Sequence, residues 1–392
     1  MTMNGYRKKY LFSQLLLTVM VIILLFALVE GLFRLQYQIA IGDSLKITLP
    51  DGLRVLQPNL DTRVIGDAGT PIHVRTNSDG FATGEHSIVA PAHTYRIVFI
   101  GSSFTQGFQV DYDKRFPDLL ERSLNEAARD RGESRRFEVL NFGMGAYSYP
   151  EQLLLYRKYV RQYHPDMVIL QAYVGFDFST NLRFLPQKDY ILRTPLEKID
   201  AAAIIAAPTE TNEKKDLKTK LVERFEVLRY AIRLVRNNPI LYQLAIRAGL
   251  LSKPFSKDVG NYLTDMWSYL DPTAEVQKNI MSFTGEMIAR VGADAEKDGA
   301  KFAVLLVPSY WQVHDKYIEE LREKKGGEID LYLPNKIVAK ELRDRYPLLD
   351  LSDPIARALN REKREVFIND VGHFTVYGHA LAAREIEKFL EW

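Results

Sequence analysis

The chain has 392 residues, of which 46% are hydrophobic and 26% charged, and its formal net charge at pH 7 is +2. This length and composition allow a large buried core, and the near-neutral charge gives no reason to expect nucleic acid as a partner. The chain has no cysteine, which excludes disulfides, thiolate metal sites and a cysteine nucleophile.

The first 35 residues predict a membrane anchor. Arg7, Lys8 and Lys9 precede an almost wholly apolar run over residues 11–33. Twenty-odd helical residues, rising ~1.5 Å each, span a hydrocarbon core of ~30 Å. The basic residues favour the cytoplasmic side, so the rest of the chain is expected outside, in the periplasm if the source is bacterial. A cleaved signal peptide is the alternative, although the run is long for one and lacks a clear cleavage site.

After the anchor, the sequence predicts a stalk and then one α/β domain. Residues 36–94 are mixed and turn-rich, and we expect a stalk followed by short strands. Within residues 95–392, strands are predicted at 96–100, 137–140, 167–173, 302–307 and 348–351. Helices are predicted at 116–128, 151–163, 275–297, 337–345 and 380–390. This alternation favours a mostly parallel sheet with helices on both faces.

A helical insertion is predicted at about residues 186–269. Apolar residues recur at three- and four-residue steps over 217–236, which is typical of an amphipathic helix, and its other face is basic. Pro239 ends this helix, and residues 240–251 predict another. The apolar stripe packs on the domain in one interpretation. In the other, the basic helix lies on an anionic membrane surface.

Two serine motifs compete as the nucleophile. The string Gly42-Asp43-Ser44-Leu45 directly follows the membrane helix, with no core strand before it and no helix after it. Residues 101–107, which contain Ser103, instead follow a buried strand and lead to a helix. The carboxyl ends of strands are where open α/β sheets build their sites. We therefore predict Ser103 as the nucleophile and regard Ser44 as a decoy.

A serine needs a base, and His373 is the best placed of the seven histidines. It lies just before the last predicted helix, and Asp370 stands three residues earlier. An aspartate at this distance on a turn can accept the imidazole N–H and orient the ring toward a serine at a neighbouring strand end.

These motifs together resemble the SGNH/GDSL hydrolase superfamily, over about residues 70–392. The resemblance implies a flavodoxin-like α/β fold and a catalytic triad of Ser103, His373 and Asp370. The sequence blocks that carry it are, in chain order, residues 101–107, 141–147, 175–177 and 370–373.

The resemblance also implies an oxyanion and substrate-binding set made of Gly145, Ala146, Asp177 and Asn181. Ala146 stands where the family's oxyanion glycine is usual, and its N–H can serve if its φ is negative. Asn181 is a candidate to supply the oxyanion with the amide donor that Phe176 cannot give.

Besides Ala146, two substitutions depart from the family's pattern. Ser102 replaces the usual aspartate of the first block, which we expect to alter hydrogen bonding in the loop more than the chemistry. Phe176 replaces the asparagine whose side chain normally donates to the oxyanion. Losing one such donor typically lowers the rate ~100- to 1,000-fold.

Three functions remain open from the sequence. The first is an esterase that removes acyl groups, acetyl above all, from a cell-envelope or extracellular glycan or an acylated small molecule. The second is an O-acyltransferase for such a polymer, which would need a membrane acyltransferase as a partner. The third is a glycan-binding or assembly protein with a catalytically impaired hydrolase fold, an alternative suggested by Phe176 in place of the oxyanion asparagine.

No metal or cofactor is predicted. The remaining histidines show no ligand spacing, and His379 fits a structural role at a helix start; the others are His73, His86, His93, His164 and His314. Residues 101–107 carry neither a phosphate-loop lysine nor the three-glycine dinucleotide fingerprint, so nucleotide binding is also unsupported.

Overall fold

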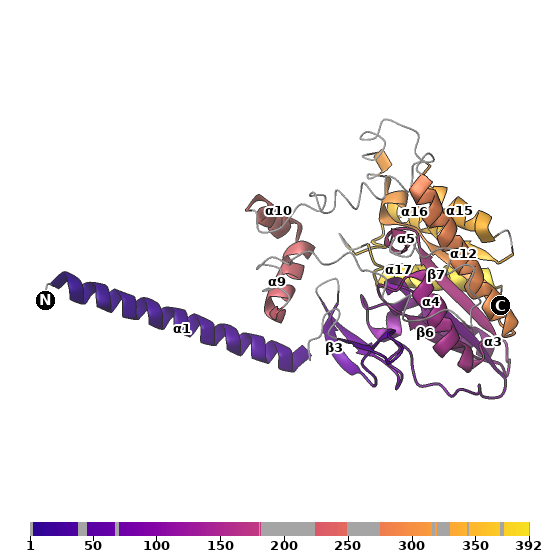
Figure 1. Cartoon of the computed structure of the whole chain (residues 1–392), viewed down its shortest axis with the longest axis horizontal. Helices are drawn as coiled ribbons and strands as arrows, with labels where there is room; N and C mark the ends of the chain where they lie inside the picture. Colours follow the sequence, from indigo (N-terminus) through magenta and orange to yellow (C-terminus); the bar gives the residue numbers. More distant parts are fainter. Residues whose placement is uncertain are drawn as a thin grey trace.

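The computed structural model describes residues 3–37, 45–66, 70–179, 181, 224–248, 275–315, 318–319, 330–342, 345–368 and 372–391. Helix α1 (Met3–Tyr37) projects away from an α/β domain, and a pair of helices, α9 and α10, lies between them (Figure 1). Within α1, Tyr10–Leu35 is long and apolar enough to cross a membrane, and a signal sequence would look the same. The predicted apolar helix is therefore confirmed as a helix.

Two small antiparallel hairpins follow α1. Strand β1 (Lys46–Thr48) pairs with β2 (Arg54–Leu56), and β3 (Asp61–Ile65) pairs with β4 (Pro71–Arg75). This confirms the expectation of short strands in this region. The hairpins also contribute buried residues such as Val55 and Ile72 to the core of the domain.

The centre of the domain is a five-stranded sheet in which every paired strand is parallel. The spatial order is β6-β5-β7-β8-β9. The strands are β5 (Thr94–Gly101), β6 (Arg136–Gly143), β7 (Met167–Tyr173), β8 (Lys301–Val307) and β9 (Leu348–Asp350). The predicted α/β class with a parallel sheet is thus confirmed. The first strand of the sheet, β5, has β6 on one side and β7 on the other, which creates a switch point at its carboxyl end.

Helices cover both faces of the sheet, as the buried strand sequences require. They are α2 (Ser103–Gln106), α3 (Phe116–Asp130), α4 (Tyr149–Leu155), α5 (Phe176–Ser179), α12 (Glu275–Lys297), α13 (Tyr310–Val313), α15 (Leu333–Leu342), α16 (Ser352–Asn360) and α17 (Val376–Leu390). Short 3₁₀ and π turns are η2 (Tyr112–Lys114), η3 (Tyr156–Val160) and η4 (Arg161–Tyr163).

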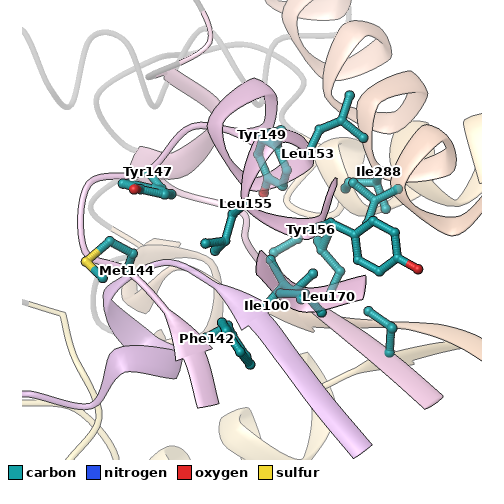
Figure 2. Close-up of a cluster of buried hydrophobic side chains, with 14 of the residues drawn as sticks. Ile100, Phe142, Met144, Tyr147, Tyr149, Leu153, Leu155, Tyr156, Leu170 and Ile288 are labelled. Carbon is teal, nitrogen blue, oxygen red and sulfur yellow. The ribbon is translucent and has the colours of Figure 1, made fainter. Parts of the chain in front are cut away.

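Alternate side chains of each strand point to opposite faces of the sheet, where they pack into two separate hydrophobic cores. Val98 and Ile100 of β5 pack with α4, α12 and α15, whereas Ile97 and Phe99 pack with α3, α16 and α17. Figure 2 shows the first core, where Ile100 from β5 and Tyr149 from α4 belong to one cluster of buried side chains. This two-sided burial fixes the sheet rigidly beneath the loops at its carboxyl edge.

Several predicted helices differ from the structure in their bounds. The helix expected over 151–163 begins at Tyr149 and passes through a π turn and a 3₁₀ turn. The helix expected over 337–345 begins four residues earlier, at Leu333. The last helix begins at Val376 instead of 380, because the Thr375 hydroxyl accepts the Gly378 N–H and caps it there. Helix α16 was not predicted at all.

Part of the predicted helical insertion is described. Helix α9 (Glu226–Asn237) and helix α10 (Pro239–Arg247) meet at Asn238, whose side-chain oxygen accepts the N–H groups of Ile240 and Leu241. The predicted break at Pro239 is confirmed, and the proline itself opens the second helix. Of the ranges predicted as helical, residues 217–223 and 249–251 lie outside the described residues.

Candidate active site

Ser103 lies at the carboxyl end of the sheet's switch-point strand. Strand β5 ends at Gly101, and Ser103 is the first residue of helix α2. The turn between them is tight: a Cβ on Gly101 would overlap the Thr105 hydroxyl and lie 2.7 Å from Gln171 Oε1. Only glycine therefore fits where the strand turns sharply to present Ser103.

A buried glutamine on the neighbouring strand holds this turn from below. Gln171 Oε1 lies 3.2 Å from the Ser102 N, 3.0 Å from the Thr105 hydroxyl and 3.4 Å from the Ser102 hydroxyl, all of which can donate to it. A carboxylate at position 102 would put a second acceptor against this oxygen. The Ser102 N–H and hydroxyl are thus two of the donors that hold this turn. Sequence reasoning missed Gln171, although a lone polar residue inside an apolar strand was a signal.

The structure brings His373 to Ser103. The Nε2 atom of His373 is 2.7 Å from Ser103 Oγ, across 270 positions of sequence. His373 lies between α16 and α17, where the Ile368 N–H donates to its backbone carbonyl at 2.7 Å. Its ring also contacts that of Phe104, with centroids 5.3 Å apart. With the ring proton on Nδ1, Nε2 can accept the Ser103 hydroxyl proton.

The third predicted triad member, Asp370, lies outside the described residues, as does the decoy Ser44. The described chain resumes at Gly372 and Leu45, respectively. Asp370 therefore stays a prediction from its spacing to His373.

Asp177 is a buried carboxyl group beneath the nucleophile loop. It belongs to the short helix α5 at the end of β7, and its Oδ2 accepts the Tyr173 N–H at 3.3 Å. Burial raises the pKa of Asp177 to about 7, against the lowering effects of hydrogen bonds from Ser102 and Tyr173 and of the nearby His373. The structure thus places Asp177 behind the loop, where it supports Ser102.

The loop after β6, where the sequence predicts oxyanion donors, lies beside Ser103. A Cβ on Gly145 would be 3.7 Å from that of Ser103. The Gly145 N–H donates to Gln106 Oε1 at 3.1 Å, so it is engaged within the protein. Ala146 has a φ of +68°, in the left-handed region. The negative φ that an alanine N–H would need to serve the oxyanion is therefore not present at Ala146.

The amide of Asn181 is directed toward helix α12. Its Nδ2 donates to the Thr284 hydroxyl at 2.7 Å, and both side chains are fully buried. This hydrogen bond gives Asn181 a structural role that the sequence did not reveal. Phe176 opens helix α5 directly after Gly175, at the carboxyl end of β7, which is the position expected for it.

The β1–β2 hairpin contacts the loop beside Ser103 through two hydrogen bonds. Lys46 of β1 donates from Nζ to the Gly145 carbonyl at 3.3 Å. The Tyr147 hydroxyl donates to the Arg54 carbonyl of β2 at 2.6 Å. Both ends of the loop beside Ser103 are thus tied to the hairpin that follows α1, a connection that no sequence pattern indicated.

His379 has the structural role expected for it. It is the fourth residue of α17 and fully buried, and its Nδ1 accepts the Phe116 N–H at the start of α3, at 3.3 Å. Burial lowers the pKa of His379 to about 3, so the ring is neutral. Among the described residues, no three His, Asp or Glu side chains are grouped in a way that could hold a metal ion.

Comparison with known proteins gives only distant similarities. No protein-family model and no curated protein matches the chain. Among solved structures, the acetyl xylan esterase AlAXEase matches at 13% identity and a TM-score of 0.40, covering 75% of this chain and 98% of that one. A member of the lipolytic G-D-S-L family from Veillonella parvula matches at 10% identity and a TM-score of 0.37, with 75% and 97% covered. An acetyl xylan esterase from Geobacillus stearothermophilus matches at 10% identity and a TM-score of 0.40, with 78% and 97% covered.

Proposed function

We propose that the chain is a membrane-anchored serine esterase that removes acyl groups, acetyl above all, from a cell-envelope or extracellular glycan. The observation that carries the proposal is the 2.7 Å contact between His373 Nε2 and Ser103 Oγ at the carboxyl edge of the sheet. A serine paired with an imidazole at this edge is the arrangement that nucleophilic acyl transfer requires.

In the proposed reaction, Ser103 Oγ attacks the ester carbonyl while His373 Nε2 takes the hydroxyl proton. The sugar oxygen leaves with that proton, and an acyl group stays on Ser103. Water then attacks the acyl carbonyl and gives a proton to His373, which returns it to Ser103 as the carboxylic acid departs. Asp370 holds the imidazole in the required tautomer in this scheme.

Among the residues that the structure describes, the oxyanion of this reaction has few hydrogen-bond donors in the site. The Ser103 N–H, at the start of α2, is one candidate donor. The Gly145 N–H already donates to Gln106 Oε1. Phe176 stands where the SGNH/GDSL hydrolases, which the sequence resembles, usually have an amide side chain. These observations also favour a second candidate function, a catalytically impaired protein that binds or assembles acylated glycans.

Acetate release separates the two functions. The full-length protein in mild detergent is incubated with acetylated xylan oligosaccharides and, separately, with p-nitrophenyl acetate. The esterase proposal predicts acetate release that Ser103→Ala abolishes. Retention of the oligosaccharide without acetate release, equal in wild type and Ser103→Ala, would support the binding function instead. Transfer of the acetyl group to an added unacetylated glycan, in preference to water, would indicate an acyltransferase.

A further inference from the structure

Helix α9 is joined to α1 through an acidic side chain inside the apolar run. Glu30 is buried, and its Oε2 accepts the Val227 N–H at the start of α9, at 3.0 Å. Its Oε1 accepts from Arg34 Nε at 2.8 Å, and Arg34 Nη2 donates to the Arg224 carbonyl at 2.9 Å. A carboxylate at a helix N-terminus is favourable, because it pairs with the unsatisfied N–H groups and with the helix dipole.

Aromatic side chains extend this contact along α1. The rings of Phe26 and Phe225 meet edge to face with centroids 5.2 Å apart, and those of Phe33 and Tyr230 lie 5.1 Å apart. Glu30 thus sits between two ring contacts, which makes α9 a packed neighbour of α1. Figure 1 shows α9 beside the end of α1 that leads to the domain, with α10 on the far side of α9.

The position of Glu30 sets the depth of α9 relative to a bilayer. The apolar part of α1 begins at Tyr10, directly after the basic residues. From there to Glu30 is a rise of twenty residues at ~1.5 Å each, or ~30 Å, which equals the thickness of the hydrocarbon core. Glu30 and the start of α9 therefore fall at the outer boundary of that core if α1 spans the membrane.

Helix α10 presents bare apolar side chains beside this boundary. Ile240 is 71% exposed, Leu241 46% and Leu244 54%. Asn238 caps α10 and fixes it against α9. This segment is also basic in sequence: Arg224 shortly precedes α9, and the pair itself contains Arg229, Arg233, Arg236 and Arg247. Apolar residues beside arginines, at the level of the head groups, are typical of helices that lie in a membrane interface.

We propose that α9 and α10 form an interfacial unit that binds the anionic outer surface of the membrane spanned by α1. In this arrangement the apolar residues of α10 enter the head-group region, and the exposed Arg224 and Arg247 contact lipid phosphates. The inference rests on the proposed anchor, but it does not depend on the chemistry proposed for Ser103. Its consequence is a fixed orientation of the domain above the membrane, in place of free rotation on a flexible stalk.

Site-directed spin labelling of the full-length chain tests this directly, because the chain has no native cysteine. Single variants Leu241→Cys, Leu28→Cys and Val89→Cys are labelled and reconstituted into vesicles of phosphatidylcholine with phosphatidylglycerol. Leu28 lies within the apolar run of α1. Val89 is a 76% exposed apolar residue shortly before β5, and so near the amino edge of the sheet, opposite the carboxyl edge that carries Ser103. Accessibility to oxygen and to a water-soluble nickel complex gives the depth of each label.

The expected result is a deep label at position 28, a label at head-group depth at position 241, and a fully aqueous label at position 89. Adding Ile240→Asp and Leu244→Asp should return the label at 241 to water and leave the label at 28 deep. Removing phosphatidylglycerol or raising salt should make the label at 241 shallower.

Three results would overturn the inference. The label at 241 could be as aqueous as the label at 89. It could be protected equally in detergent and in vesicles, with spin–spin broadening, which would mean that a second copy of the chain covers α10. An aqueous label at 28 would remove the anchor and with it the interfacial unit, whereas acetate release in solution would still report on Ser103 separately.

Discussion

Asp177→Asn should make the stability of the protein less sensitive to a rise in pH from about 5 to about 8. The pKa of about 7 in the folded protein lies above the ordinary aspartate value of 3.8, because the carboxyl is buried. Between these values the folded protein holds a proton that the unfolded chain releases, so the contribution of Asp177 to the unfolding free energy falls as pH rises through this window and is flat above it.

The size of the effect follows from the two pKa values. One pKa unit corresponds to about 1.4 kcal/mol. Integrated from about pH 5 to about pH 8, the shift costs the wild type roughly 2–3 kcal/mol of unfolding free energy that the amide variant does not lose. The variant changes packing and hydrogen bonding as well, but that change is the same at every pH and cancels in the comparison.

Urea unfolding of full-length wild type and variant, in mild detergent at pH 5, 6, 7 and 8, measures this difference. The stability of Asp177→Asn relative to wild type should rise from pH 5 to pH 7 and then level off toward pH 8. Ser102→Ala is the matched control, since it keeps the Asp177 carboxyl but removes a hydrogen bond that lowers its pKa. In this variant the loss of unfolding free energy should therefore occur at higher pH than in wild type. Parallel stability curves for wild type and Asp177→Asn would refute a neutral buried carboxyl.

Three further predictions concern the loop beside Ser103, the oxyanion site and the topology. Lys46→Met should lower kcat on p-nitrophenyl acetate several-fold with little change in KM, because it frees the Gly145 carbonyl; an unchanged kcat would show that the loop needs no tie to the hairpin. Phe176→Asn should raise turnover on the same ester about tenfold or more, since one well-placed hydrogen bond is worth ~1.4 kcal/mol; a fall in turnover would indicate that Phe176 packs on the substrate. A reporter active only in the cytoplasm, fused after Trp392, should be silent, and reporter activity would reverse the orientation.

The regular elements were predictable because burial on both faces leaves a plain pattern. The apolar run of β7 and the spacing of α12 gave bounds identical to those in the structure. Helix ends were less predictable, because they depend on single caps such as Thr375. The π and 3₁₀ turns after α4 carry no distinct periodicity.

The candidate site was predictable where a motif and the topology agree. Ser103 follows a buried strand at the edge where parallel strands end, and His373 stands three residues after an aspartate on a predicted turn; the structure brings the two side chains together across 270 positions. Contacts from outside the regular pattern were not predictable. Lys46 reaches Gly145 from an isolated hairpin, and Glu30 caps a helix almost two hundred positions away. Neither position has a periodic or motif signal that would have revealed its partner.

The most direct test of the account is covalent labelling of Ser103. The full-length protein is treated with a fluorophosphonate in mild detergent, and the modified peptide is identified by mass spectrometry. The account predicts modification at Ser103, its loss in Ser103→Ala, slow labelling in His373→Ala, and normal labelling in Ser44→Ala. Modification at Ser44, or a folded wild type that takes no label, would contradict the assignment of Ser103 as the nucleophile.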